Sequence, residues 1–214
     1  MIKHYSVLGD SISTFDGMVA AGNAVYYEGE RAAHNNVNTP SDTWWMQAIS
    51  ALGGKLLRNA SYSGSLVAGA AFPAGRSPER AWQLLGASGQ QPDVVLVYLG
   101  INDYGEGTPL DEFADAYRAM LAQVAQVAPN AEVWCLTLLP GRSEEHDVEF
   151  FRSKYKGADL EAYNAAIRQA AADGGARVVD VAVVGRPFDT LDGTHPTRRG
   201  MLQLAAAFAE ALPR

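Results

Sequence analysis

Four short polar segments of the sequence carry side chains that could perform chemistry. They are 9–11 (Gly-Asp-Ser), 59–64 (Asn-Ala-Ser-Tyr-Ser-Gly), 100–103 (Gly-Ile-Asn-Asp) and 192–195 (Asp-Gly-Thr-His). Acyl transfer requires a nucleophile, a base, a group that orients the base, and hydrogen-bond donors for the oxyanion. Together the four segments contain a candidate for each of these roles.

Ser11 is the candidate nucleophile, and it stands where a helix should begin, so its own N–H is a free donor. His195 is the candidate base because histidine accepts and returns a proton near neutral pH. Asp192, three positions earlier, can bind Nδ1 of that imidazole and leave Nε2 for the serine. Asn102 offers a side-chain amide and Gly64 a backbone N–H as further oxyanion donors.

Asp10 and Asp103 stand beside two of these candidates and are predicted to support them. We expect Asp10 to fix the loop of Ser11 and Asp103 to shape the turn at Asn102. Each segment taken singly also has an ordinary structural explanation, because Asp, Asn and Gly are common turn residues. The order of the segments and their shared position after strands favour the catalytic interpretation.

The elements that must position these segments alternate between strands and helices. Apolar runs predict strands at 7–9, 55–59, 94–99, 133–138 and 177–181. Helical patterns occur at 43–52, 77–85, 108–128, 159–172 and 197–212, and the third opens with a capping box at Thr108 and with Pro109 at its first position. This alternation predicts an α/β fold with a parallel sheet. Such folds bind ligands beyond the carboxyl ends of their strands, where the polar segments fall.

The length of 214 residues predicts one domain spanning 1–214. Two segments, at about 14–42 and 141–157, are longer than compact connections need, and we expect long cleft-side loops there. Their aromatic residues either line a substrate cleft or pack the loops onto the domain. These residues include Phe15, Tyr26, Tyr27, Phe150 and Phe151.

Composition argues against several classes of function. The net charge of −7, from 17 basic and 24 acidic residues, disfavours nucleic acid and anionic membranes as partners. No apolar run reaches the ~20 residues of a membrane span. The first residues resemble a strand more than a signal peptide, so we expect a cytoplasmic protein. The lone Cys135 stands in an apolar run and predicts a buried thiol. The sequence makes no prediction of oligomeric state.

The segments at 9–11, 64, 100–103 and 192–195 resemble the blocks that define the SGNH (GDSL-type) hydrolases. The resemblance extends over nearly the whole chain, although Ile12 follows the serine where the family often has Leu. It implies a flavodoxin-like, three-layer α/β/α fold with a five-stranded parallel sheet in the order 2-1-3-4-5. It also implies a serine esterase or acylhydrolase. In that family the matching residues are the triad Ser11, Asp192 and His195, with Ser11, Gly64 and Asn102 as the oxyanion hole.

No metal or organic cofactor is expected, because such a mechanism needs none and no nucleotide-binding motif occurs. The expected partner is a small-molecule acyl ester. A small acyl group, for example acetyl on a carbohydrate, is favoured over a long lipid chain because no broad apolar lid is evident. A lysophospholipase- or thioesterase-like acylhydrolase of the same fold is the alternative.

Two other classes of function are open. A metal-dependent phosphoesterase would draw Asp10, Asn102, Asp103, Asp192 and His195 into an oxygen-rich metal site, although such sites usually recruit several histidines. A binding module that has lost activity would be expected to lack the nucleophile, the base or the orienting group, and all three are present.

Overall fold

A parallel sheet forms the centre of the structure, a computed structural model that describes residues 1–184 and 186–212 of the predicted 1–214 span. Five strands of the described chain make this sheet, in the spatial order β2-β1-β3-β4-β6. They are β1 (His4–Gly9), β2 (Lys55–Asn59), β3 (Val94–Tyr98), β4 (Glu132–Leu136) and β6 (Arg177–Val179). Since these are the sheet's first to fifth strands along the chain, the predicted order 2-1-3-4-5 is confirmed.

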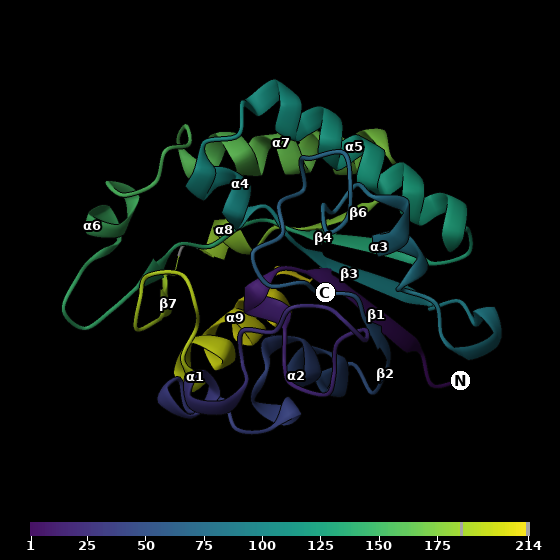
Figure 1. The fold of residues 1–214 in the computed structure, drawn as a ribbon, viewed down its shortest axis with the longest axis horizontal. Helices are drawn as coiled ribbons and strands as arrows, with labels where there is room; N and C mark the ends of the chain where they lie inside the picture. The colour runs from purple at the N-terminus through teal and green to yellow at the C-terminus, as the bar shows by residue number, and fades with distance from the viewer. Residues whose placement is uncertain (185, 213–214) are drawn as a thin grey trace.

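Helices cover both faces of this sheet (Figure 1). On one face α5 (Leu110–Val127) packs along α7 (Leu160–Asp173), and the short α3 (Pro78–Trp82) contacts α5. On the other face α2 (Trp44–Ala51) packs against α9 (Arg198–Ala211). The result is the three-layer α/β/α arrangement that the sequence predicts.

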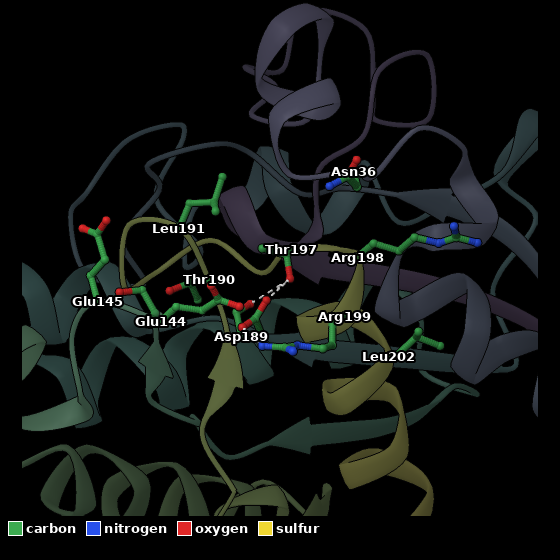
Figure 2. Close-up of a pocket in the computed structure, with 11 residues that line it drawn as sticks. Asn36, Glu144, Glu145, Asp189, Thr190, Leu191, Thr197, Arg198, Arg199 and Leu202 are labelled. Atoms are coloured by element: carbon green, nitrogen blue, oxygen red, sulfur yellow. Dashed lines mark hydrogen bonds and ion pairs between the residues drawn. The ribbon is translucent and has the colours of Figure 1, made fainter.

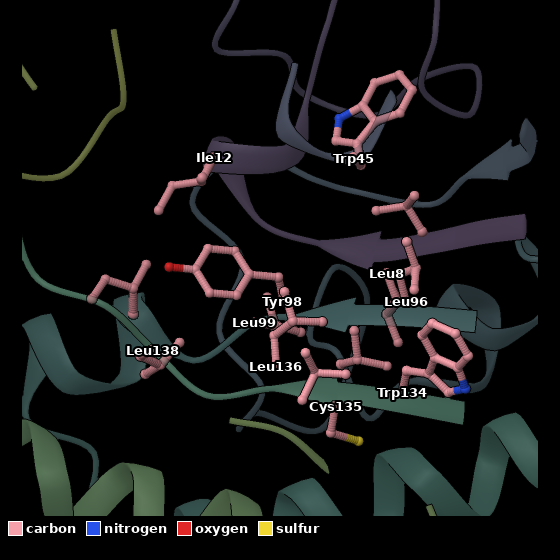
Figure 3. Packing of buried hydrophobic residues seen from close by; sticks show 14 of the residues in the cluster. Leu8, Ile12, Trp45, Leu96, Tyr98, Leu99, Trp134, Cys135, Leu136 and Leu138 are labelled. Carbon is pink, nitrogen blue, oxygen red and sulfur yellow. The ribbon is translucent and has the colours of Figure 1, made fainter. Parts of the chain in front are cut away.

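The hydrophobic core lies between the sheet and these helices. Every residue of β3 is buried, as expected for a continuous apolar strand between two helical layers. Figure 3 shows Leu96 and Tyr98 of β3 packed among side chains of β4 and α2, including Trp134 and Trp45. Cys135 is buried in this cluster, and burial raises the pKa of its thiol to about 12, which leaves it unreactive. No helix in the described part of the chain is long and apolar enough to span a membrane.

The predicted helices all occur, but α5 begins differently from the prediction. Pro109 is the cap residue, with an extended ψ of 138°, and no side chain caps the helix. Thr108 lies outside the helix, where its carbonyl accepts the hydroxyl of Tyr163 at 2.6 Å. The predicted capping box is therefore wrong, since Pro109 is the cap residue and Thr108 takes part in a tertiary contact instead.

Short elements occupy the two segments that the sequence predicts as long loops. The first contains α1 (Gly29–His34) and a 3-10 turn (Pro40–Asp42). The second contains β5 (Gly141–Arg142), which pairs with β7 (Phe188–Asp189), and α6 (Val148–Arg152). Two more short helices, α4 (Ile101–Glu106) and α8 (Val181–Val184), follow strands β3 and β6. All of these are too short to produce a periodic pattern in the sequence.

The aromatic residues of these segments mostly pack inward. Phe15, Tyr27 and Phe151 are buried, so they fasten the segments to the domain. Phe150 is exposed at the surface and stacks on His146. Tyr26 stacks on the predicted catalytic base, His195, and is described with it below.

Candidate active site

Ser11 is the second residue after β1, where the chain turns into a 3-10 helix (η1, Ser11–Ser13). Asp10 caps this helix, since its Oδ1 accepts the N–H of Ile12 at 3.0 Å. Gly9 allows the turn to pack closely, because a Cβ there would lie 2.6 Å from the side chain of Ser13. The N–H of Ser11 has no acceptor within its helix, so it is available to a ligand.

A continuous chain of hydrogen bonds joins Ser11, His195 and Asp192. The Oγ of Ser11 lies 2.8 Å from Nε2 of His195, and Nδ1 of His195 lies 2.7 Å from Oδ2 of Asp192. Because an ionised carboxylate only accepts, Nδ1 carries the proton and Nε2 accepts from the serine. The structure therefore brings together three residues from the two ends of the chain.

Asp192 is held in its ionised form. Its second oxygen, Oδ1, accepts the N–H groups of Thr194 at 3.0 Å and His195 at 2.8 Å. Burial acts to raise the pKa of Asp192, but the hydrogen bond and charge of His195 and the two backbone donors outweigh it and lower the pKa to about 2. A carboxylate that stays charged at neutral pH can orient the imidazole and stabilise its cation.

The turn that carries Asp192 and His195 is clamped by both long segments. Gly193 has a φ of +87°, and a Cβ there would lie 2.0 Å from the ring of Phe151. On the other side, the hydroxyl of Tyr27 donates to the carbonyl of Pro196 at 2.8 Å. Phe151 belongs to the second long segment and Tyr27 to the first, so both segments position the catalytic turn.

The other two predicted oxyanion donors lie on loops that are tied to each other. Gly64 has a φ of +79°, and its N–H donates to no other group in the described part of the chain. Asn102, at the start of α4, donates one side-chain N–H to the carbonyl of Ser65 at 2.9 Å, and its second N–H has no acceptor among the described residues. The N–H of Tyr62 donates to Gly9 at 3.1 Å, which places the Gly64 loop beside the end of β1.

Asp103 contacts a segment that the sequence did not connect with it. Its carboxylate accepts the N–H groups of Val67 at 2.8 Å and Ala68 at 3.0 Å. It therefore fixes the loop that carries Gly64, and its role in shaping the turn at Asn102 stays a prediction. Burial raises the pKa of Asp103, and these two backbone bonds act in the opposite direction.

The residues proposed as ligands for a metal-dependent phosphoesterase do not come together as a metal site in the described part of the chain. Asp10 and Asp103 direct their carboxylates at backbone N–H groups. Within residues 1–184 and 186–212, no three His, Cys, Asp or Glu side chains are grouped as a metal ion would require. The arrangement favours chemistry by a nucleophile and a base.

A cavity of about 760 Å³ is lined by residues on either side of the catalytic turn, including Thr190 and Thr197, but not by Ser11, Asp192 or His195 (Figure 2). Asp189 lies at its base, hydrogen-bonded to Thr197 and paired with Arg199. Glu144 and Glu145 of the second long segment form one wall (Figure 2). The remaining lining residues are Asn36, Ser143, Leu191, Arg198 and Leu202.

Two residues near the site have no recognisable signal in the sequence. Arg80 is fully buried and donates to the carbonyls of Gly9, Ala60 and Pro73, so it ties the end of β1 to the loops after β2. Tyr26 lies against the imidazole of His195. The sequence does not distinguish a buried arginine from an exposed one. Tyr26 is one of several aromatic residues in its segment, and no motif sets it apart.

The sequence profile of the GDSL-like lipase/acylhydrolase family matches residues 7–202. No curated protein sequence matches the chain. A Bacteroides uniformis protein classed as a GDSL-like lipase superimposes with a TM-score of 0.70 and 26% identity, over 99% of this chain and 95% of its own. A Bacteroides ovatus protein of the same class superimposes with a TM-score of 0.71 and 22% identity, over 98% of this chain and 97% of its own. A carbohydrate esterase family 2 enzyme of Corynascus thermopiles superimposes with a TM-score of 0.61 and 20% identity, over 98% of this chain and 66% of its own.

Asp10 predicts a pH dependence of stability. Burial raises its pKa to about 7 in the folded protein, against about 4 for an aspartate in an unfolded chain. Between these values the folded state holds a proton that the unfolded state has released, so the free energy of unfolding falls as pH rises from about 4 to about 7. In Asp10→Asn we expect the free energy of unfolding to fall less over this pH range, because the titrating carboxyl is gone. Urea denaturation at several pH values from about 4 to about 7 measures the difference.

The difference between the two stability curves reports Asp10 together with its repulsion from the nearby charge of Asp103. The exposed Asp16 supplies a matched control, and Asp16→Asn should follow the wild-type curve. Parallel curves for Asp10→Asn and the wild type would contradict the prediction.

Proposed function

The chain belongs to the GDSL-like lipase/acylhydrolase family and is a carboxylic ester hydrolase, and we propose that it cleaves small acyl esters through Ser11, His195 and Asp192. The observation that carries this proposal is the pair of hydrogen bonds, 2.8 and 2.7 Å long, that links these three side chains. The same hydrogen-bonded arrangement, from nucleophile to base to carboxylate, occurs in serine hydrolases on unrelated folds.

In the first half of the reaction, Ser11 Oγ attacks the ester carbonyl while Nε2 of His195 takes its proton. The charge that develops on the carbonyl oxygen is held by the N–H groups of Ser11 and Gly64 and by the amide of Asn102. Collapse of the tetrahedral intermediate breaks the bond to the alcohol, which leaves with the proton from His195. The acyl group remains on Ser11.

In the second half, His195 takes a proton from water, and the resulting hydroxide attacks the acyl carbonyl. The oxyanion is held by the same three donors. The bond to Ser11 Oγ then breaks, the proton returns to the serine, and the acid is released. Asp192 remains charged throughout and stabilises the imidazolium in both halves.

Ser11→Ala is expected to lower kcat for p-nitrophenyl acetate by at least about 10³-fold, because it removes the hydroxyl that forms the acyl-enzyme. The measurement is hydrolysis of the acetate, butyrate and octanoate esters by both proteins, with circular dichroism to establish that the variant is folded. We expect the wild type to prefer the acetate.

Ser13→Ala controls for loss of a hydroxyl in the same turn, since Ser13 accepts from the indole of Trp44 and does not contact His195. It should remain active. Full activity of Ser11→Ala, or activity only on phosphodiesters with added metal, would refute the serine mechanism. A preference for octanoate would favour the lysophospholipase- or thioesterase-like alternative.

Asn102→Ala tests the assignment of the oxyanion donors. We expect kcat to fall about 10²- to 10³-fold with little change in KM, because the lost donor binds a charge that exists mainly in the transition state. Steady-state kinetics on p-nitrophenyl acetate measure both constants. Asn130→Ala, which removes an exposed amide, should leave them unchanged. A wild-type kcat for Asn102→Ala would show that Asn102 is not an oxyanion donor.

We also propose that the alcohol part of the substrate carries many hydroxyl groups, as a carbohydrate does. The cavity supports this, because residues that flank the turn of His195 line it and its walls include carboxylate, guanidinium and amide groups. Its volume is within the range of small-molecule sites. The structural similarity to a carbohydrate esterase family 2 enzyme supports the same substrate class.

Glu144→Ala and Arg198→Ala test this cavity with an acetylated xylo-oligosaccharide. We expect each to raise KM for the oligosaccharide about 5- to 10-fold, the effect of one charge-assisted hydrogen bond to a hydroxyl. The KM for p-nitrophenyl acetate, which has no hydroxyl groups to bind, should not change. Glu112→Ala removes an exposed carboxylate from α5 and serves as the control. Equal effects on both substrates would refute a leaving-group site in the cavity.

A further inference from the structure

We propose that Tyr26 is a positioning residue for His195, which it holds in the plane required for proton transfer. The inference rests on the Ser11–His195–Asp192 mechanism proposed above and adds a fourth side chain to it. Tyr26 lies in the middle of the first long segment and outside the four polar segments that identified the site.

The ring of Tyr26 and the imidazole of His195 form a close, parallel stack. Their centroids are 3.5 Å apart and their planes differ by 7°. The hydroxyl of Tyr26 lies 3.3 Å from Oδ2 of Asp192, the oxygen that also accepts from Nδ1 of His195. Tyr26 therefore contacts the base and the group that orients it. Since 3.3 Å is long for an O–H···O bond, the ring contributes more than the hydroxyl.

Tyr26 is itself held by the turn that carries the nucleophile. Its N–H donates to Thr14 Oγ1 at 2.9 Å, and that hydroxyl donates to the carbonyl of Ser11 at 2.9 Å. The ring of Tyr27 packs edge-on against Tyr26 at 4.9 Å, and the guanidinium of Arg31 lies 5.6 Å from the centroid of Tyr26. The stacked ring and the nucleophile are therefore positioned by one network.

The stack acts most strongly when His195 is protonated. The face of an aromatic ring attracts a cation, and the attraction grows where water is excluded. His195 is an imidazolium in the transition states for acylation and deacylation, so the contact with Tyr26 is stronger there than in the resting enzyme. A contact of this kind raises kcat more than it lowers KM. Burial and the nearby charge of Asp192 raise the pKa of Tyr26 to about 12, so its hydroxyl remains a donor at neutral pH.

Substitutions of Tyr26 separate the ring from the hydroxyl. We expect Tyr26→Leu to lower kcat for p-nitrophenyl acetate about 10- to 100-fold with KM within about twofold of the wild type. Tyr26→Phe keeps the stack and should stay within about threefold of the wild-type kcat. Tyr5→Phe is the control, because it removes a tyrosine hydroxyl near the start of β1, at the opposite end of that strand from Ser11. Its kcat should not change.

A second measurement requires no turnover. The proton between Nδ1 of His195 and Asp192 gives a far-downfield proton NMR signal, which is assigned by its absence in His195→Gln. We expect the signal to persist in Tyr26→Phe and to broaden or vanish in Tyr26→Leu, because the imidazole is no longer held in the plane of that bond. Tyr26→Met replaces Tyr26→Leu if circular dichroism shows the leucine variant to be unfolded.

The two measurements distinguish this inference from the mechanism on which it rests. A folded Tyr26→Leu or Tyr26→Met protein with wild-type kcat and an unchanged downfield signal overturns the role of Tyr26. Full activity in Ser11→Ala overturns the serine mechanism instead. In that case the NMR signal still reports whether Tyr26 positions His195.

Discussion

The hydrogen bond between Ser11 and His195 is the contact on which the rest of the site depends. Ser11 follows a central strand, whereas His195 lies on an irregular turn whose only sheet-like pairing in the described chain is an isolated bridge between Thr190 and Pro196. Since a displacement of 1 Å in an active site can lower a rate about 100-fold, such a turn has to be held by other parts of the molecule. The two long segments supply these contacts. Their length is therefore explained by the catalytic turn before any contact with substrate is considered.

A related constraint accounts for the buried charged groups beneath the site. Parallel strands end where their chains turn into loops, and the backbone groups at those ends lose their partners in the sheet. Arg80 donates to three carbonyls there, and Asp103 accepts two N–H groups of the loop after β2. Burial lowers the pKa of Arg80 to about 10, so it remains charged at neutral pH. Burying a charge is costly, and these charges persist because each satisfies several groups at once.

The sheet and the residues around Ser11 were predictable because they depend on local signals. A continuous apolar run such as β3 identifies a buried parallel strand, and the polar residues that follow such strands must share one edge of the sheet. The clamping contacts were not predictable. Tyr27 and Pro196 are 169 positions apart and Val67 and Asp103 are 36 apart, and neither pair has a periodic signature. The start of α5 shows the same limit, because its capping pattern does not reveal the contact that Thr108 makes with α7.

The packing of the long segments also bears on how a substrate is recognised. Aromatic residues in loops near a cleft suggest stacking on sugar rings, but Phe15, Tyr27 and Phe151 are buried in this protein. The proposed site for a hydroxyl-rich alcohol is instead the cavity whose walls include Asn36 of the first segment and Glu144 of the second. The segments that clamp the catalytic turn therefore also line the proposed leaving-group site.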